Sequence, residues 1–369
     1  MKITIVGAGN GGLAAAADLT LRGFSVTLYE HPDFESNIEP IRITGTIGLS
    51  TLPSTGLAGG FAKPARITTR ADEAVGEAEI VLIVVPAFAQ SAILDLIAPH
   101  LREGQTLVLM PGGFGAAVLC YKKLTEKFGI KGVLIAETAT LPYACRKLDA
   151  TSVWIRGRKA LFDISTYPGK NTGEVLELFQ RLYPDAIAAD NVLQTALNNL
   201  NPFVHPPIIL LNAGSVDRGE RTLFYHEALT ISARRLIEAL DKERLTLGEA
   251  LGLTLQPIYQ LMLGHYRHQG AQGENIQEVA GHSLIYSWSY TPDSLESRYL
   301  TEDIPMNLFP LAELAKQVRS PYATMETMIS LGSTVLDRDL RQDARTLGQM
   351  GMEGLQPEEL RRALEDGTL

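Results

Sequence analysis

The chain has few cysteines, no long apolar segment and no excess of positive charge. Among its 369 residues, only Cys120 and Cys145 are cysteines, which is too few for a disulfide framework or a zinc site built on cysteine spacing. No apolar run is long enough to span a bilayer, and the chain opens on a strand pattern instead of a signal peptide. The net charge of −9 argues against a nucleic-acid partner. We therefore expect a cytoplasmic protein that binds neither nucleic acid nor membrane, and we expect no metal site.

The sequence does contain a glycine-rich motif between a strand and a helix. Residues 1–6 are a short apolar run with β-branched side chains, and residues 13–23 are good helix formers that end on a glycine. The motif between them consists of Gly7, Ala8, Gly9, Asn10, Gly11 and Gly12. A second strand pattern then ends at Glu30. A strand, Gly-x-Gly-x-x-Gly, a helix, a strand and an acidic residue together are typical of the Rossmann dinucleotide-binding unit.

Each part of this unit has an expected role. Gly7 permits the tight turn, Gly9 lets a pyrophosphate approach the backbone, and Gly12 allows close packing of the helix on the strand. The free N–H groups at the helix start would face the phosphates, and Glu30 would bind the adenosine ribose. Residues 30–33 contain no Lys or Arg to pair with a 2′-phosphate. The expected cofactor is NAD, with NADP still possible; a flavin domain or an unrelated glycine-rich turn fits the flanking elements less well.

The residue patterns divide the chain into an α/β part and an all-α part. Up to residue 187, strand patterns alternate with helical ones, which predicts a Rossmann-type NAD(P)-binding domain. One continuous apolar strand pattern ends at Pro86, which should lie at the ligand crevice and contact the cofactor. Within the irregular stretch that follows Glu30, residues 41–45 read as a short strand. Residues 188–369 show only helical spacing and predict a helical substrate and catalytic domain, with residues 336–345 as a solvated helix face.

The first polar cluster of the helical part is NNLNPFVHPP, residues 198–207. Pro206 and Pro207 should bias His205 away from helical geometry and hold its backbone rigidly. An imidazole held between apolar segments suits a general acid/base. The alternative is a histidine that only satisfies the polar groups of a buried helix end.

The second polar cluster is SRYLTEDIP, residues 297–305, which we expect to form a loop before Pro305. Arg298 offers the planar fork that binds a carboxylate substrate. Asp303 could orient a histidine and stabilise its cation. The alternative is a surface cluster of helix caps and local ion pairs.

Several longer motifs make the chain resemble the octopine/nopaline (opine) dehydrogenase family over nearly its whole length. They are GAGNGG, VVPA, PGGFG, ETATLPYACR, NNLNPFVHPPIILLNAG, the ER…LGEALG helix and RYLTEDIP. The resemblance implies a Rossmann domain followed by a helical domain of the 6-phosphogluconate dehydrogenase C-terminal type. It also implies NAD(P)H-dependent reductive condensation of an amino acid with a 2-oxo acid such as pyruvate. The product would be an N-(carboxyalkyl) amino acid, and the reverse oxidation would also occur.

The same resemblance implies roles for individual residues. His205 would donate and accept the proton, Asp303 would be its partner, and Arg298 would hold the carboxylate of the 2-oxo acid. Glu137 would lie near the amino acid, and Asn201 would belong to the substrate-binding set.

One departure from the family pattern and three questions stay open. Gln90 stands where that pattern leads us to expect a histidine, which leaves the contacts near the nicotinamide undecided. A 2-oxo acid or ketopantoate-type reductase of the same superfamily would need no amine, and a non-catalytic NAD-binding sensor would need no positioned His, Arg and Asp. A homodimer is possible, although no residue pattern establishes it.

Overall fold

The computed structural model describes all residues from Met1 to Leu369 and divides into two compact units. Unit 1 comprises Met1–Gly112 and Ala116–Ala189, and unit 2 comprises Gly113–Gly115 and Asp190–Leu369. The predicted classes, a Rossmann-type α/β part followed by a helical part, are confirmed. None of the helices combines the length and the apolar character that crossing a bilayer requires.

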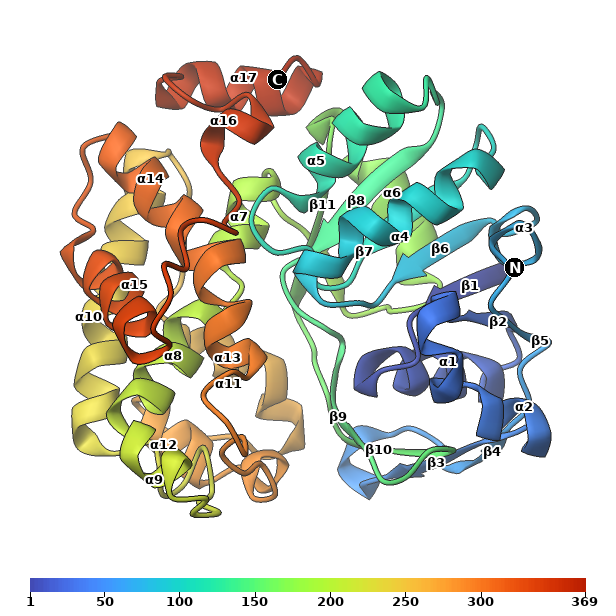
Figure 1. Cartoon of the computed structure of the whole chain (residues 1–369), viewed down its shortest axis with the longest axis horizontal. Helices are drawn as coiled ribbons and strands as arrows, with labels where there is room; N and C mark the ends of the chain where they lie inside the picture. Colours follow the sequence, from blue (N-terminus) through green and yellow to red (C-terminus); the bar gives the residue numbers. More distant parts are fainter. The chain divides into compact units, whose positions relative to one another are not determined.

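Unit 1 is built on an eight-stranded sheet of order β12-β11-β8-β7-β6-β1-β2-β5. The strands from β5 to β8 run parallel, whereas β11 joins β8 antiparallel (Figure 1). The strand order reverses direction between β1 and β6, so the ligand crevice of this fold lies at their carboxyl ends. The strands are β1 (Lys2–Val6), β2 (Ser25–Tyr29), β5 (Arg66–Thr68), β6 (Ile80–Ile83), β7 (Thr106–Leu109), β8 (Leu134–Thr138), β11 (Phe162–Thr166) and β12 (Ala186–Ala188).

The turn after β1 leaves no room for a side chain at two of its glycines. Gly7 has a φ of +102°, and a Cβ there would lie 2.6 Å from the carbonyl oxygen of Val84. A Cβ on Gly12 would lie 1.8 Å from the carbonyl oxygen of Gly7. The following helix can therefore pack closely against the turn only because both positions are glycine.

One predicted strand of unit 1 is wrong. Residues 41–45 were expected to be extended, but Glu39–Thr44 form helix α2, with Pro40 in its first turn and Gly45 at its end with a φ of +69°. Proline at the start and glycine after the end are helix-boundary signals, and they outweigh the β-branched residues between them. The helices of unit 1 are α1 (Asn10–Leu21), α2 (Glu39–Thr44), α3 (Ala71–Val75), α4 (Gln90–Ile97), α5 (Ala116–Lys122) and α6 (Thr172–Gln180).

A second sheet of unit 1 has the strand order β4-β3-β10-β9. Strand β10 pairs antiparallel with β9, which directly precedes it in the chain, and parallel with β3, which is about 100 residues earlier. All four strands pack against α1. The strands are β3 (Ile47–Thr51), β4 (Gly60–Ala62), β9 (Tyr143–Lys147) and β10 (Ser152–Arg158).

Unit 2 is helical apart from one isolated bridge between Leu223 and Tyr290. Helix α8 packs against α10, α13 and α15, as Figure 1 shows. The helices are α7 (Val192–Leu197), α8 (Asn201–Leu211), α9 (Ala213–Asp217), α10 (Ile231–Ala250), α11 (Ile258–Tyr266), α12 (Ile276–Gly281), α13 (Arg298–Thr301), α14 (Phe309–Gln317), α15 (Ala323–Val335), α16 (Leu347–Met350) and α17 (Pro357–Asp366).

The expected non-helical geometry of His205 is also wrong. His205, Pro206 and Pro207 all lie inside α8. Each proline removes one backbone hydrogen bond from the helix, but every residue from Pro202 to Leu210 is buried. Burial of this apolar surface stabilises the helix more than the missing bonds destabilise it.

Two further expectations about unit 2 need correction. Residues 297–305 do not form a loop, because α13 is followed by a single π-helical turn, η9 (Ile304–Leu308), with Pro305 in its first turn. Residues 336–345 are turns and not a solvated helix, and Arg345 within them is buried. Its guanidinium donates to the carbonyl of Phe114 at 2.9 Å. The charge-rich stretch 336–345 thus includes a buried arginine with a structural role, which the charge pattern alone does not indicate.

Lys159 holds the segment that follows β8 in unit 1. Its ammonium donates to Thr140 Oγ1 at 2.6 Å and to the carbonyl of Leu141 at 3.0 Å. Burial lowers the pKa of Lys159 from 10.5 to about 8, because a low-dielectric environment disfavours the charged form.

Replacing Lys159 by methionine should therefore change how stability depends on pH. Because the folded pKa lies below the unfolded one, the unfolded chain binds more protons between these values, and stability rises with pH there. The free energy of unfolding of the unaltered chain, relative to Lys159→Met, should rise by about 2 kcal/mol between about pH 7.5 and pH 9.5. Urea titrations at several pH values measure this difference. Lys131→Met, at an exposed position, is the control. The prediction would be contradicted if the free energy of unfolding of Lys159→Met depended on pH in the same way as that of the unaltered chain.

Candidate active site

A buried imidazole–carboxylate pair lies in unit 2. His205 Nδ1 is 2.7 Å from Asp303 Oδ2, and the exposed fractions of the two residues are 7% and 2%. The two residues are 98 positions apart in the chain. Since an ionised carboxylate only accepts hydrogen bonds, Nδ1–H donates to Asp303 and Nε2 is directed away from it.

Aromatic side chains surround the imidazole of His205. The ring of Tyr299 lies tilted against it with the centroids 4.2 Å apart, and Phe224 meets its edge at 5.6 Å. The hydroxyl of Tyr225 lies 3.3 Å from Nε2. With the proton on Nδ1, this hydroxyl donates to Nε2. The ring is thus held in one orientation by Asp303 and by the surrounding aromatic rings.

Arg298 stands at the start of α13, in the same segment as Asp303. Its Nε is 3.3 Å from Glu302 Oε2, and its side chain is 51% exposed whereas that of Glu302 is 7% exposed. Desolvation opposes the charge, but Glu302 and Asp303 outweigh it, so the pKa of Arg298 lies above its ordinary value. Glu302 orients the guanidinium through Nε, so its terminal nitrogens can bind an anion in a fork.

Asn201 begins α8 one helical turn before His205. Residues four apart share one helix face, so both belong to the same face of α8. The backbone N–H of Asn201 donates to Asn199 Oδ1 at 3.2 Å, and Asn199 Nδ2 donates to Asn307 Oδ1 at 3.3 Å. The same oxygen of Asn307 accepts the N–H of Phe114 at 3.1 Å. The asparagine-rich motif thus fixes the start of α8 and the segment Gly113–Gly115.

The ER pair of the ER…LGEALG motif has a structural role on helix α10. Arg244 is completely buried and donates to the carbonyl of Leu197, at the end of α7, at 3.2 Å. Burial lowers its pKa, and Asp241 partly offsets this effect. The carboxylate of Glu243 accepts the N–H groups of Thr324 and Met325 at the start of α15, at 2.6 and 3.0 Å. The motif therefore ties together the helices that position His205.

In unit 1, the glycine-rich loop leaves space for a ligand. A Cβ added to Gly9 would meet no atom within 4 Å, and Gly9 has an ordinary φ of −74°. Neither packing nor backbone geometry requires glycine there, whereas a phosphate approaching the backbone would. Helix α1 begins at this point with no side-chain cap and no acidic residue in its first turn. These features fit the pyrophosphate of a dinucleotide.

Glu30 lies beside the same loop. Its carboxylate accepts the backbone N–H of Ala8 at 2.9 Å and Asn37 Nδ2 at 3.2 Å. Glu30 is 6% exposed. The structure thus places the carboxylate of Glu30 beside Ala8 and holds it in a defined orientation.

The other predicted residues of unit 1 lie at the carboxyl ends of strands. Pro86 follows β6, and Glu137 in β8 is buried, with Oε2 accepting the N–H of Ala117 at 2.8 Å. Gln90 Nε2 donates to the carbonyls of Pro111 and Gly112 at 3.2 and 3.1 Å. The residue that departs from the family pattern therefore supports the glycine-rich turn after β7.

Sequence reasoning did not identify Tyr225, Glu302 or Lys147. Tyr225 lies in a segment without a recognisable motif, and Glu302 stands beside Asp303, where it reads as one more surface charge. The ammonium of Lys147 lies 3.4 Å from the carbonyl oxygen of Ala8. This contact joins residues 139 positions apart, and no local signal in the sequence reveals it.

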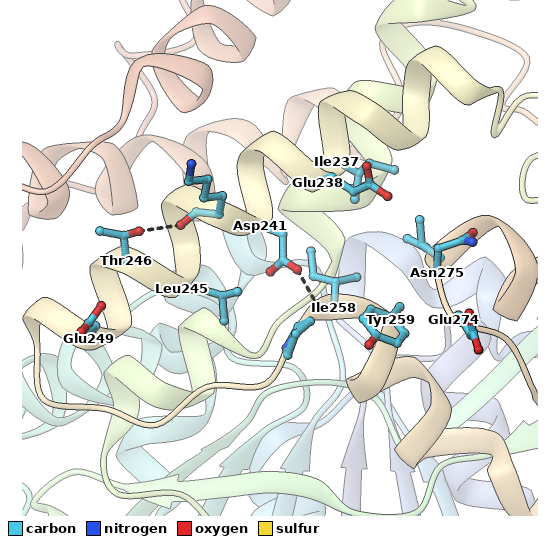
Figure 2. A pocket seen from close by; sticks show the side chains of 13 residues that line it. Ile237, Glu238, Asp241, Leu245, Thr246, Glu249, Ile258, Tyr259, Glu274 and Asn275 are labelled. Atoms are coloured by element: carbon cyan, nitrogen blue, oxygen red, sulfur yellow. Dashed lines mark hydrogen bonds between the residues drawn. The ribbon is translucent and has the colours of Figure 1, made fainter.

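A separate pocket of about 340 Å³ in unit 2 contains none of the predicted site residues. Figure 2 shows that its wall is formed by α10, α11 and the start of α12. Asp241 in this wall accepts the N–H of Ile258 at 2.9 Å and pairs with Arg244 at 2.7 Å. The carboxylate of Asp241 is therefore engaged in holding α10 and α11 together.

Comparison with known proteins gives matches over both units. A family model described as "NAD/NADP octopine/nopaline dehydrogenase, alpha-helical domain" matches residues 188–336. A second model, "NAD-dependent glycerol-3-phosphate dehydrogenase N-terminus", matches residues 2–134. An opine dehydrogenase of Arthrobacter sp. (strain 1C) is 33% identical over 361 residues, which cover 98% of each chain.

Solved structures of octopine dehydrogenase share this fold. The structure with NADH and L-arginine is 22% identical, covers 100% of this chain and 98% of its own, and gives a TM-score of 0.77. The structure with NADH and pyruvate has the same coverage, 21% identity and a TM-score of 0.76. Since the identity to the Arthrobacter enzyme extends over nearly the whole of both chains, this chain belongs to the opine dehydrogenase family of NAD(P)-dependent oxidoreductases.

Proposed function

We propose that the protein condenses an amino acid with a pyruvate-like 2-oxo acid and reduces the resulting imine, and that it also catalyses the reverse oxidation. The observation that carries this proposal is the His205–Asp303 pair, with Arg298 in the same short segment as Asp303. Octopine dehydrogenase, which shares the fold, has been solved with NADH and either L-arginine or pyruvate. An acid/base group and a carboxylate-binding fork are what this chemistry requires.

His205 is the proposed general acid/base. The amine adds to the oxo carbon, and the C–O bond of the adduct breaks as Nε2 of protonated His205 gives its proton to the departing oxygen, which leaves as water. Asp303 holds the proton on Nδ1 and stabilises the imidazolium. NAD(P)H, when bound, supplies the hydride that reduces the imine carbon. The hydroxyl of Tyr225 lies at the nitrogen that must exchange the proton, so the substrate oxygen has to approach beside it or replace it.

Substrate binding is assigned to Arg298, Asn201 and Glu137. Arg298 would hold the 2-oxo acid carboxylate with its terminal nitrogens, since Glu302 engages Nε. Asn201 shares a helix face with His205 and would add a polar contact. Glu137 would lie near the amino acid, because its carboxylate belongs to the carboxyl end of β8.

The cofactor is assigned to the glycine-rich loop, Glu30 and Pro86. The loop would bind the pyrophosphate, and Glu30 would bind the adenosine ribose and favour NAD over NADP by charge repulsion. We place the reaction in the cytoplasm, because both cysteines are free thiols. A homodimer is also proposed, since Leu331 and Val335 expose apolar surface one turn apart on α15.

The reaction itself is tested by NADH oxidation with pyruvate and a panel of amino acids. Oxidation that requires both an oxo acid and an amine is the expected result. Oxidation with the oxo acid alone would instead support a simple 2-oxo acid reductase. NADH binding without turnover on any combination would support a non-catalytic sensor.

Gly9→Ala and Gly12→Ala should separate cofactor binding from folding. Gly9→Ala adds a Cβ into open space, so the melting temperature should be unchanged while NADH binding weakens by about tenfold or more. Gly12→Ala places its Cβ against the carbonyl of Gly7 and should lower the melting temperature by several degrees. Thermal melts and fluorescence titration with NADH measure both effects. Unchanged NADH affinity in folded Gly9→Ala would contradict the assignment of this loop.

Loss of the imidazole should remove acid/base catalysis without removing the cofactor. His205→Ala should lower kcat by about 10²–10⁴-fold, and Asp303→Asn should have an effect of similar order because it removes the charge that fixes Nδ1–H. NADH affinity should stay unchanged in both variants. The exposed His282, changed to Ala, is the matched control. A His205→Ala enzyme that keeps kcat within a factor of about three would exclude this role.

Arg298→Lys keeps the charge but loses the fork. The KM for the 2-oxo acid should rise by about 10–100-fold, with a smaller change in the KM for the amino acid. Arg338→Lys is the matched control, since Arg338 forms an exposed ion pair with Glu296 at the same distance of 3.3 Å. Equal rises in both KM values for Arg298→Lys would show that Arg298 does not distinguish the two substrates.

A further inference from the structure

Strand β9 of the second sheet lies across the glycine-rich loop of unit 1. The backbone N–H of Lys147 donates to Asn10 Oδ1 at 2.8 Å, and the thiol of Cys145 donates to the carbonyl of Asn10 at 3.3 Å. The Lys147 ammonium is 3.4 Å from the carbonyl oxygen of Ala8. Strand β9 and helix α1 also pack together. These contacts anchor β9 at the start of α1, where the loop meets the helix.

Lys147 brings a positive charge to this loop that no carboxylate of the chain neutralises. In the folded chain its ammonium contacts a neutral carbonyl oxygen and not a carboxylate. The side chain is partly buried, so its placement is defined by the strand. An ammonium beside an uncapped helix start and beside the open space at Gly9 adds to a local field that favours an anion.

We propose that Lys147 binds the pyrophosphate of the dinucleotide, as a cationic residue that the second sheet supplies to the Rossmann loop. This inference rests on the assignment of the cofactor to that loop. Lys147 approaches Ala8 at its carbonyl, whereas Glu30, at the expected ribose site, accepts the N–H of Ala8. The lysine is therefore associated with the phosphate-binding loop more directly than with the ribose, where the additional phosphate of NADP would lie.

Equilibrium binding of NADH and NADPH to the full chain tests this proposal. Lys147→Gln should weaken both ligands by a similar factor of about tenfold, because both carry the same pyrophosphate. The affinity of the unaltered chain should also depend more steeply on salt concentration than that of the variant. Fluorescence titration measures affinity without turnover. Lys147→Arg, which keeps the charge, should retain most of the affinity.

The neighbouring Arg146 provides a matched control. Arg146→Gln removes the same charge as Lys147→Gln. Arg146 is exposed, and successive residues of a strand point to opposite faces. The affinities of Arg146→Gln for NADH and NADPH should therefore equal those of the unaltered chain. Weakening of NADPH alone by Lys147→Gln would move the lysine to the 2′-phosphate and overturn the pyrophosphate assignment. Unchanged affinities in a variant with a normal melting temperature would also overturn it. If the unaltered chain bound neither nucleotide, the cofactor assignment would fail instead.

Discussion

The hydrogen bond between His205 and Asp303 constrains much of unit 2. Both residues are buried and belong to different helical segments, 98 positions apart. A buried carboxylate is tolerated only when it is paired, and an imidazole is useful in proton transfer only when one nitrogen is fixed. The helices that carry the two residues therefore have to be held in a constant relation. This requirement explains why so many of the surrounding polar contacts join one helix to another.

Buried polar residues far from the imidazole meet this requirement. Arg244 on α10 binds the end of α7, which precedes α8 in the chain, and Glu243 beside it caps α15, which packs against α8. Asn307 in the π-helical turn binds Asn199 and Phe114. Each of these groups is costly to bury unless its partners are in place. Satisfied together, they favour a single arrangement of the helices.

The glycine-rich loop of unit 1 is held in place mainly by close backbone packing, whereas the helices around His205 are held by buried polar side chains. Gly7 and Gly12 are required by the packing of the chain itself, whereas a Cβ at Gly9 would meet no atom within 4 Å. Gln90 supports the turn after β7, and β9 covers the start of α1. The proposed binding surface is thus held by contacts to the backbone from several segments, which leaves few side chains to interfere with a bound anion.

The sequence by itself determined the classes of the two parts, the nucleotide-binding motif and the family, because these depend on local periodicity and on contiguous motifs. It also identified His205 and Asp303 as candidates. It placed His205 outside a helix, since local preference cannot include the energy of burial that keeps α8 helical. It placed residues 41–45 in a strand, because their β-branched side chains were given more weight than the boundary signals of Pro40 and Gly45. Only the tertiary structure brought Asp303 to the imidazole, Tyr225 to its other nitrogen and Lys147 to the loop. Such contacts join residues distant in the chain, and it is the packing of whole helices and strands, not the neighbours in sequence, that brings them within hydrogen-bond distance.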